Sequence, residues 1–315
     1  MSPSCDVPVC GCSAMWIRLL ALARLIRLPN VFTAPADVLA GYWLFVGLAG
    51  PRFSATLFWA AVGSMLLYAA GIVFNDLYDL ELDRRERPER PLPSGLVPTP
   101  LAMFVAAAAL ASGVAAVAAA GPLAATAAWL LAVLMLLYNW LLKTNAAGPV
   151  AMGACRAVNV QIGMAVGMAA AQAEPAAGNW VAIPAIANGL YIAGVSVLAR
   201  DEVAATQRNN VGLGVVLIAA GLVLHPMVWM SAEAPYAGAA LGLLLIYGGW
   251  LAYALIRTFE APDPDRVQSV VKTSILGLIL VDAAVAAAFV GPLTAAVVLL
   301  LLVPAVYLGR WLPST

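Results

Sequence analysis

The sequence predicts an all-α integral membrane protein, a polytopic bundle of nine to ten transmembrane helices. Hydrophobic residues make up 63% of the 315 positions, charged residues make up only 10%, and the mean hydropathy is +0.94. A soluble domain carries roughly 25% charged residues, so the composition excludes a soluble enzyme, a disordered chain and a nucleic-acid binder. The apolar runs are continuous and do not alternate with polar residues, which favours helices over a transmembrane barrel.

Ten apolar runs, bounded by glycine, proline or charge, approach the length of about 20 residues that a transmembrane helix needs. In order they are 31–49, 54–75, 101–120, 123–142, 149–171, 180–199, 211–230, 236–257, 270–290 and 293–309. Alanine and glycine are frequent in them, which allows close helix packing in a bilayer.

The first five runs have clear boundaries. The first follows a short Arg-Leu-Pro-Asn segment that ends at Asn30, and the second ends where a polar, acidic loop begins. The third and fourth are separated only by the Gly-Pro pair at 121–122, which indicates a hairpin turn. The fifth follows Lys143 and carries an arginine, Arg156, within its apolar sequence.

The last five runs are bounded in the same way. The sixth ends at a second polar loop, which starts at Arg200. The seventh contains His225, the single histidine, which we expect to pack at a helix end without a chemical role. The eighth ends in a polar segment, Lys272 opens the ninth, and the Gly-Pro pair at 291–292 indicates a hairpin turn before the tenth.

The placement of the cations predicts the orientation. With a cytoplasmic N-terminus, fourteen of the sixteen cations face the cytoplasm: Arg18, Arg24, Arg27, Arg84, Arg85, Arg87, Arg90, Lys143, Arg200, Arg208, Arg257, Arg266, Lys272 and Arg310. The outer turns carry only Arg52, and Arg156 lies within a run. This asymmetry follows the positive-inside rule. It places both long polar loops, 76–100 and 200–210, in the cytoplasm.

The loop after the second run carries periodic acids. On a helix that continues past Asn75, the side chains of Asp76, Asp79 and Asp83 fall within about 60° of one face. Three such carboxylates repel one another unless a divalent cation neutralises them, and Mg²⁺ prefers hard oxygen ligands. Arginines suited to phosphate follow them: Arg84, Arg85, Arg87 and Arg90. The pattern predicts a Mg²⁺–diphosphate site, with a merely solvated charged loop as the alternative.

The order Asn-Asp-x-x-Asp-x-x-x-Asp from Asn75 to Asp83, followed by Arg-Pro-x-Arg-Pro-x-Pro-Ser-Gly, resembles the first signature of the UbiA superfamily of intramembrane prenyltransferases. The resemblance to this superfamily extends to two further places: the Arg-Leu-Pro-Asn segment that ends at Asn30, and Tyr138 with Lys143. The resemblance implies a bundle around a central cavity, capped by two Asp-rich cytoplasmic loops that bind Mg²⁺ and an isoprenyl diphosphate.

Within that superfamily the chain most resembles the EboC-like branch, through segments 36–37, 152–159 and 199–203. The second acidic motif is reduced to Asp201 and Glu202, which point about 100° apart on a helix. This second metal site is therefore expected to be weak, water-mediated or absent, and Glu202 is the residue that agrees with the branch pattern. The branch favours a non-quinone acceptor such as a polyol or cyclitol, although the polar lining does not decide it.

Polar residues inside the apolar runs are costly and usually face a cavity. In the functional interpretation, diphosphate or acceptor is held by Asn30, Arg156, Asn159 and Lys272, together with Arg87, Arg90 and Lys143 of the loops. Asp37 or Asp282 then contacts the acceptor or takes a proton. In the alternative, an ion pair between Asp37 and Arg156 only fixes helix packing.

These observations together predict Mg²⁺-dependent transfer of a prenyl group from a polyprenyl diphosphate to a small-molecule acceptor within the bilayer. A transporter and a non-catalytic isoprenoid-binding protein are the alternatives. The expected organisation is a cytoplasmic tail and interfacial helix (1–30), a UbiA-like bundle (31–290) and an extra C-terminal span with a tail (291–315). We expect a prokaryotic inner or plasma membrane.

Overall fold

The computed structural model describes residues 11–46, 53–172, 182–200, 208–260 and 264–312. Within these ranges the regular structure is helical and contains no strand. In chain order the helices are α1 (Gly11–Leu25), α2 (Leu28–Val31), α3 (Thr33–Val46), α4 (Ala55–Tyr78), α5 (Leu80–Glu86), α6 (Thr99–Ala118), α7 (Pro122–Leu137), the π-helix η2 (Tyr138–Leu142), α8 (Gly148–Ala171), α9 (Ile183–Ala199), α10 (Arg208–Ser231), α11 (Ala237–Glu260), α12 (Pro264–Val290), α13 (Pro292–Leu299) and α14 (Leu302–Trp311).

Each of the ten predicted runs coincides with a helix or a pair of helices. Eight segments of the described chain are long and apolar enough to cross a membrane. The other two runs correspond to α3, with 14 residues, and α9, with 17, which are shorter than a full span. The last run is divided into α13 and α14. The protein is therefore an integral, multi-pass membrane protein, as the composition predicted.

The two predicted Gly-Pro hairpin turns are confirmed. Gly121 and Gly291 have φ values of 125° and 118°, which residues with a Cβ rarely adopt. In both turns the proline starts the next helix, where its missing N–H would have no helical partner. The turns join α6 to α7 and α12 to α13 with almost no loop.

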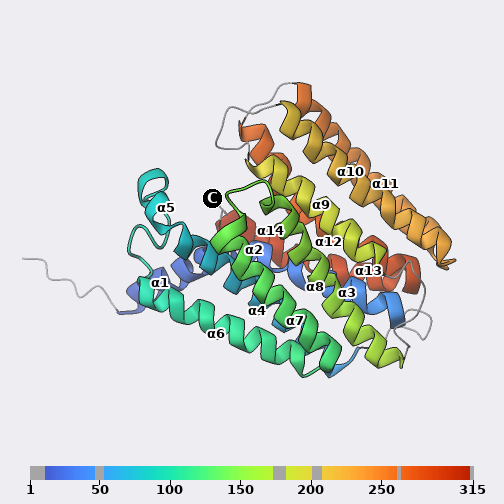
Figure 1. Ribbon diagram of the computed structural model, residues 1–315, viewed down its shortest axis with the longest axis horizontal. Coiled ribbons are helices and arrows are strands. Elements are labelled where there is room, and N and C mark those ends of the chain that lie inside the picture. Colours follow the sequence, from blue (N-terminus) through green and yellow to red (C-terminus); the bar gives the residue numbers. More distant parts are fainter. Residues whose placement is uncertain (1–10, 47–52, 173–181, 201–207, 261–263, 313–315) are drawn as a thin grey trace, which may run out of the picture.

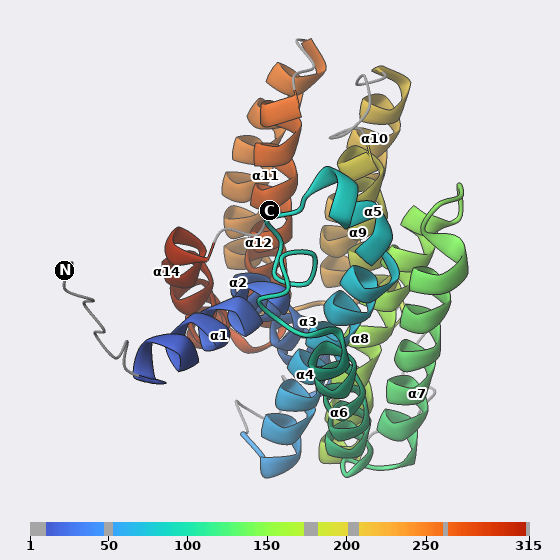
Figure 2. The same cartoon turned by 90° about the vertical axis from the view of Figure 1, so that its left-hand side faces the viewer.

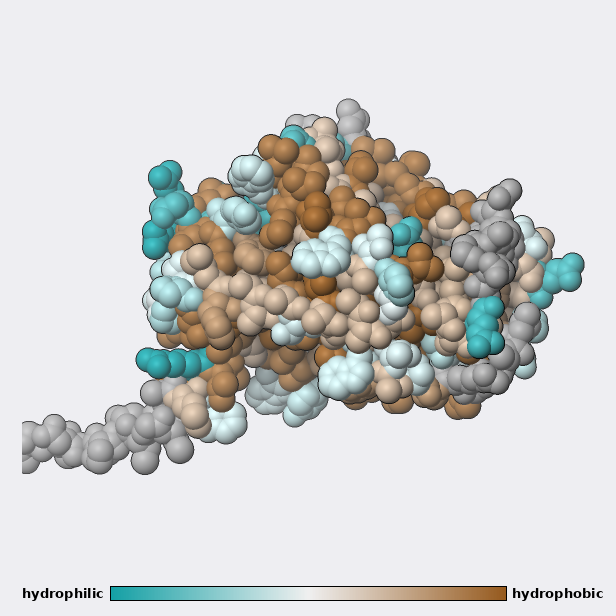
Figure 3. Space-filling model, turned by 60° about the horizontal axis from the view of Figure 1, so that its bottom comes forward, coloured by the Kyte–Doolittle hydropathy of each residue, from teal (hydrophilic) through white to brown (hydrophobic). Residues whose placement is uncertain are grey.

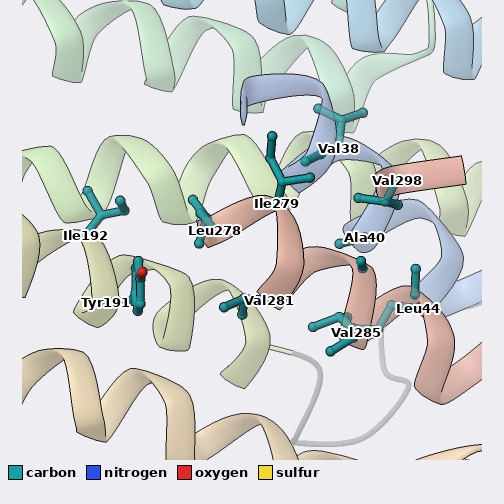
Figure 4. Packing of buried hydrophobic residues seen from close by; sticks show 14 of the residues in the cluster. Val38, Ala40, Leu44, Tyr191, Ile192, Leu278, Ile279, Val281, Val285 and Val298 are labelled. Carbon is teal, nitrogen blue, oxygen red and sulfur yellow. The ribbon is translucent and has the colours of Figure 1, made fainter. Parts of the chain in front are cut away.

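The helices form one bundle in which α3, α8, α9 and α12 lie inside (Figure 1). In the membrane-spanning stretch of α12, 72% is buried inside the protein. The same share is 28% for α6 and for α11, so α6 and α11 lie at the outside of the bundle. Buried side chains of α3, α9, α12 and α13 meet in the core (Figure 4). The short helices α1 and α5 lie at the same end of the bundle, the end that faces the viewer in Figure 2.

Two glycines hold α3 close to α8. A Cβ at Gly163 of α8 would collide with the carbonyl oxygen of Val38, and one at Gly41 of α3 would collide with that of Val160. Small residues allow this approach, which is how helices associate where lipid offers no hydrophobic drive. The contact places the polar residues of α3 directly against those of α8.

The outside of the bundle is apolar. Figure 3 shows a face covered mostly by hydrophobic side chains, with hydrophilic ones gathered at its two edges. Large hydrophobic side chains that are exposed on the bundle include Phe104, Trp129 and Leu245. An apolar belt between polar edges fits a bilayer.

Candidate functional site

The predicted acidic face is interrupted at Asp79. Helix α4 ends at Tyr78 and α5 begins at Leu80, because Asp79 has φ −86° and ψ 0°, outside helical values. The helix therefore continues past Asn75 as far as Tyr78, and the angular projection from Asp76 to Asp83 does not apply across Asp79. The helical hydrogen bonding still extends to this residue, because the Asp79 N–H donates to the Asn75 carbonyl at 3.0 Å.

Each of the three predicted carboxylates pairs with a different cation. We call these six side chains the ion-pair layer: Arg27, Asp76, Asp79, Asp83, Arg90 and Lys143. Arg27 Nη2 lies 3.2 Å from Oδ1 of Asp76, and Lys143 Nζ contacts Oδ1 of Asp79. The residues of these two pairs are 49 and 64 positions apart in the chain, so tertiary packing brings them together.

The third pair is the most buried of the layer. Nη1 of Arg90 lies 3.0 and 2.8 Å from the two carboxylate oxygens of Asp83, and both side chains are less than a tenth exposed. The loop between them is held by backbone bonds as well, because the Arg87 N–H donates to the Asp83 carbonyl and the Arg90 N–H to that of Arg87. This pair therefore folds the arginine-rich loop back onto α5.

The three carboxylates that the sequence predicts as Mg²⁺ ligands have side-chain cations as their partners in the structure. Side-chain cations neutralise them one to one. No group of three or more Asp, Glu, His or Cys side chains placed to share a metal occurs within the described residues. The carboxylates of Asp76 and Asp79 and the amide oxygen of Asn75 are nevertheless hard oxygen donors of the type that Mg²⁺ takes, so their chemistry fits the ion.

Arg27 reaches the layer from a strained turn. It precedes α2 with φ 47° and ψ 53°, the left-handed region that a non-glycine residue enters only at a cost. The turn separates α1 from α2, the short helix that contains the half-buried Asn30. The hydroxyl of Thr33 donates to the Asn30 carbonyl at 2.8 Å, so the start of α3 fixes this segment.

Lys143 is positioned by a π-helix. The five residues of η2 end α7 with i→i+5 bonds, and the Lys143 N–H donates to the Tyr138 carbonyl at 3.0 Å. Inside η2, Asn139 Nδ2 donates to the Gly71 carbonyl of α4 at 3.2 Å. Arg200 at the end of α9 donates to the carbonyl of Lys143 at 2.9 Å and to that of Asn145. Such local π-turns are frequent at functional sites.

The other predicted site residues are placed less tightly. Arg87 is half-buried at the end of α5, and Asn75 is half-buried one turn before Asp79. Lys272 is exposed on α12 and makes no hydrogen bond or ion pair with the residues that the structure describes, so it is not brought into the layer. Asp201 and Glu202 lie outside the described residues.

Deeper in the bundle, Arg156 and Asn159 belong to a second group of polar side chains. We call this group the buried network: Thr33, Asp37, Ser64, Arg156, Asn159, Asn188, His225 and Asp282. Arg156 Nη1 lies 3.1 Å from Oδ2 of Asp37, the ion pair that the sequence offered as one alternative. Asn159 Nδ2 donates to the same oxygen at 2.7 Å. Its own amide oxygen accepts the Ser64 hydroxyl at 2.6 Å.

Asn188 extends the network to α10 and α12. Its Nδ2 donates to Oδ1 of Asp282 at 2.8 Å and lies 3.3 Å from Oδ1 of Asp37. Its Oδ1 lies 3.1 Å from Nε2 of His225. The expectation that His225 only packs at a helix end is therefore wrong: it is buried within α10, because the partner amide on α9 satisfies its ring nitrogen.

Arg156 connects the two groups. Its Nη2 donates to the Thr33 hydroxyl at 2.6 Å, and that hydroxyl donates to the carbonyl of Asn30. Its guanidinium also lies 5.7 Å from the centre of the Tyr68 ring, a cation–π distance. A continuous polar path therefore leads from the buried carboxylates to the segment that carries Arg27.

Sequence reasoning missed several of these residues. Ser64 and Asn188 are single polar residues in apolar runs, and that isolation is the signal that could have found them. Arg27 was noted for its motif and as one of the cytoplasmic cations, but nothing in the sequence predicts its left-handed backbone or its pairing with Asp76. Thr33 had no signal beyond its position at the start of a run.

Comparison with known proteins places the chain in a family. The UbiA prenyltransferase family matches residues 37–271, about three quarters of the chain. A digeranylgeranylglyceryl phosphate synthase of Ignicoccus hospitalis is 35% identical over 126 residues, which cover 40% of this chain and 40% of that protein. The chain thus spans less than half the length of this curated relative.

Solved structures share the fold. A structure of digeranylgeranylglyceryl phosphate synthase aligns with a TM-score of 0.62 at 20% identity, covering 87% of this chain and 99% of that one. A UbiA homolog from Archaeoglobus fulgidus, bound to GPP and Mg²⁺, aligns with a TM-score of 0.56 at 18% identity, covering 84% and 99%. Both likenesses establish the helical arrangement.

Proposed function

We propose that this chain, which belongs to the UbiA prenyltransferase family, transfers a prenyl group from a polyprenyl diphosphate to an acceptor within the membrane and releases diphosphate. The observation that carries the proposal is the ion-pair layer, where three cations and three carboxylates meet at one end of an apolar bundle. The EboC-like branch and its polyol or cyclitol acceptor stay predictions.

The cations of the layer suit the diphosphate. Arg27 and Lys143 each bind one carboxylate, and both side chains are partly exposed, at 29% and 17%. A diphosphate that enters can take over these two donors, because it offers more negative charge than a single carboxylate. Asn30 can add an amide hydrogen bond, and Arg87, which ends α5, is a further cation of this loop.

The carboxylates that lose their partners suit a metal ion. Asp76 and Asp79, with Asn75, would hold Mg²⁺ on the protein side, and Asp83 would remain with Arg90. Bound there, Mg²⁺ neutralises charge on the leaving diphosphate. Asp201 and Glu202 are the proposed ligands of a second ion. The Archaeoglobus fulgidus homolog, bound to GPP and Mg²⁺, supports this assignment by its fold.

The reaction breaks the allylic C–O bond to diphosphate and forms a bond from the same carbon to the acceptor, which loses a proton. Arg27, Lys143 and Arg87 stabilise the charge that develops on the leaving oxygen. The apolar helices hold the prenyl chain and keep water from the allylic cation. Tyr68 presents a ring that can face this cation, as it already faces Arg156.

Release of diphosphate from geranylgeranyl diphosphate by the purified chain tests the proposal. We expect release that needs Mg²⁺ and stops with EDTA. Binding of the diphosphate without release, at any Mg²⁺ concentration and with a panel of acceptors present, would instead favour a non-catalytic isoprenoid-binding protein. If the chain released diphosphate but bound prenyl diphosphates no better than other diphosphates, both the prenyl transfer and the isoprenoid-binding alternative would be contradicted.

We further propose that the N-terminus, the ion-pair layer and residues 200–210 face the cytoplasm, and that 1–30, 31–290 and 291–315 are a tail with an interfacial helix, the catalytic bundle and an added C-terminal span. Single cysteines in a cysteine-free background check the orientation. Cysteines at positions 86 and 208 should react with an impermeant reagent from the cytoplasmic side, and those at 174 and 233 from the outside. The reverse pattern would move the site to the other compartment.

A further inference from the structure

A small cavity lies between α1 and the loop that follows α5, two elements at the same end of the bundle (Figure 2). Its volume is about 230 Å³. A pocket that encloses a complete small-molecule ligand holds roughly 300–1,000 Å³, so this cavity fits only a part of a larger molecule. Five of its seven lining side chains are apolar, and the other two are Arg24 and Glu89. None of the seven belongs to the ion-pair layer or to the buried network.

The α1 wall of the cavity is an apolar stripe that is open to the surroundings. Its residues are spaced by three and four positions and so share one face of the helix: Ile17, Leu20, Ala21 and Arg24. Ala21 is buried, whereas Ile17 and Leu20 are about half exposed, and the neighbouring Trp16 is exposed as well. A surface helix with exposed apolar side chains and a tryptophan suits the interface of a bilayer. Membrane lipids are therefore the molecules that surround this cavity.

The opposite wall is a loop that is held in place by its own hydrogen bonds. The hydroxyl of Ser94 donates to the Arg90 carbonyl at 2.7 Å, and the Val97 N–H donates to the Pro91 carbonyl at 3.0 Å. Leu92 and Val97 are buried in one apolar cluster with side chains of α1 and α4. The cavity is therefore a fixed feature of the fold, because it lies between two elements that already pack together.

Two opposite charges line this otherwise apolar cavity. The side chains of Arg24 and Glu89 are exposed, and neither forms an ion pair or a hydrogen bond with the residues that the structure describes. Their charged groups are therefore more than 4.0 Å apart, although both line the same cavity. A group that bridges them has to carry negative charge at one end and positive charge at the other. A lipid head group with a phosphate and a primary ammonium matches this arrangement.

We propose that this cavity binds a zwitterionic amino-phospholipid of the phosphatidylethanolamine type. The first part of one acyl chain lies between α1 and the loop, the phosphate binds Arg24, and the ammonium donates to Glu89. Phosphatidylglycerol has no cation for Glu89, and phosphatidylcholine has no N–H to donate to it. The bound lipid joins α1 to the loop in which the next residue, Arg90, pairs with Asp83. This inference goes beyond the proposed prenyl transfer and does not depend on it.

Three lipids with identical acyl chains test the inference. The full chain in detergent is titrated with dioleoyl phosphatidylethanolamine, phosphatidylcholine or phosphatidylglycerol, and native mass spectrometry measures the fraction that carries one lipid. We expect phosphatidylethanolamine to bind about fivefold more tightly than the other two, the scale of one partly exposed charge pair. Glycerophosphoethanolamine, the head group without acyl chains, should not displace it, because it leaves the apolar walls uncovered. Equal binding of the three lipids, or tighter binding of phosphatidylglycerol, would overturn the inference.

Two charge variants make the test specific to the cavity. Glu89→Gln removes the anion, so phosphatidylethanolamine should lose its advantage over phosphatidylcholine, which should bind as before. Arg24→Gln removes the partner of the phosphate and should weaken the binding of both lipids about fivefold. Glu86→Gln and Arg18→Gln are the matched controls, because these exposed charges of α5 and α1 do not line the cavity. An unchanged preference in Glu89→Gln, or a lost preference in the controls, would contradict the inference.

A third variant tests the place of the acyl chain. Leu20→Trp fills the cavity from an exposed position, so the preference for phosphatidylethanolamine should disappear while the chain stays folded. If the preference persisted in this variant, the head group would be bound elsewhere and the inference would be wrong. A protein segment seated in the cavity would show as no lipid preference in the parent chain, which would also overturn the inference. Diphosphate release is measured separately, so either proposal can fail without the other.

Discussion

In the ion-pair layer every carboxylate has its own cation, whereas in the buried network two carboxyl groups face one guanidinium. The first group lies at helix ends and loops, and two of its three pairs are partly exposed. The second lies wholly within the helices, and its partners are mostly amides and hydroxyls. One region therefore lies near the water boundary and the other inside the protein, and they hold charge in different ways.

The difference teaches which residues can change partners. A pair at the water boundary is worth little in stability, since water replaces either partner. Such a pair can open to admit a diphosphate and a metal ion. A pair deep in the bundle cannot be separated without leaving an uncompensated charge. The ion-pair layer is therefore suited to turnover, and the buried network to fixing a geometry.

The largest effect should come from the layer. Asp79→Ala or Asp76→Ala removes a proposed metal ligand, so diphosphate release should fall at least about 1000-fold, which corresponds to about 4 kcal/mol. The unfolding temperature of the Asp79→Ala variant should change little, because the Asp79 side chain is partly exposed, whereas loss of the buried Asp76 side chain should lower it more. Glu81→Ala is the matched control, since Glu81 is 79% exposed and its only ion pair within the described ranges is with Arg84. Near-normal turnover in the Asp79 and Asp76 variants would remove the first metal site.

The next effect should be on the stability of the protein, and it should come from the buried network. Asp37→Leu leaves the Arg156 guanidinium buried without its carboxylate, so the free energy of unfolding should fall by about 3–5 kcal/mol. Asp37→Asn keeps a hydrogen-bond acceptor and should lose less. Thermal unfolding in detergent micelles measures both. If Asp37→Leu were as stable as Asp79→Ala, the two regions would not differ as described.

The second acidic motif should show an intermediate effect. Asp201 and Glu202 are adjacent, so only one of them can face a metal ion well. We expect Glu202→Gln to lower diphosphate release by about 100-fold, close to 2.7 kcal/mol, and Asp201→Asn to lower it less. Equal, mild effects would mean that this loop holds no metal and that the ion-pair layer works alone.

The smallest effect should come from a residue that only positions the layer. Arg200→Gln removes the donors to the carbonyls of Lys143 and Asn145, worth about 1 kcal/mol. Release should then fall about fivefold, and the Michaelis constant for the diphosphate should rise, because Lys143 is less well placed. Arg257→Gln, an exposed arginine that contacts Tyr253, is the control. A larger loss of diphosphate release would indicate that Arg200 contacts the substrate directly.

The amino-acid sequence by itself determined the class of the molecule. Continuous apolar runs with no charged surface can only be buried in a bilayer, and each predicted run is a helix in the structure. The Gly-Pro turns followed from local backbone preferences. The acids from Asp76 to Asp83 and their arginines were visible as a motif, because they are close together in the chain.

Only the tertiary structure decided which charges meet. Arg27 and Asp76 are 49 residues apart, and Asn188 and Asp37 are 151 apart. Such pairings depend on helix packing: α3 and α9 both lie against α8, and Gly41 and Gly163 allow the close approach of α3 to α8. The helix break at Asp79 likewise depends on one backbone angle that the sequence pattern does not encode. Local patterns report nearest neighbours in the chain, whereas a site joins helices whose contact is a property of the whole bundle.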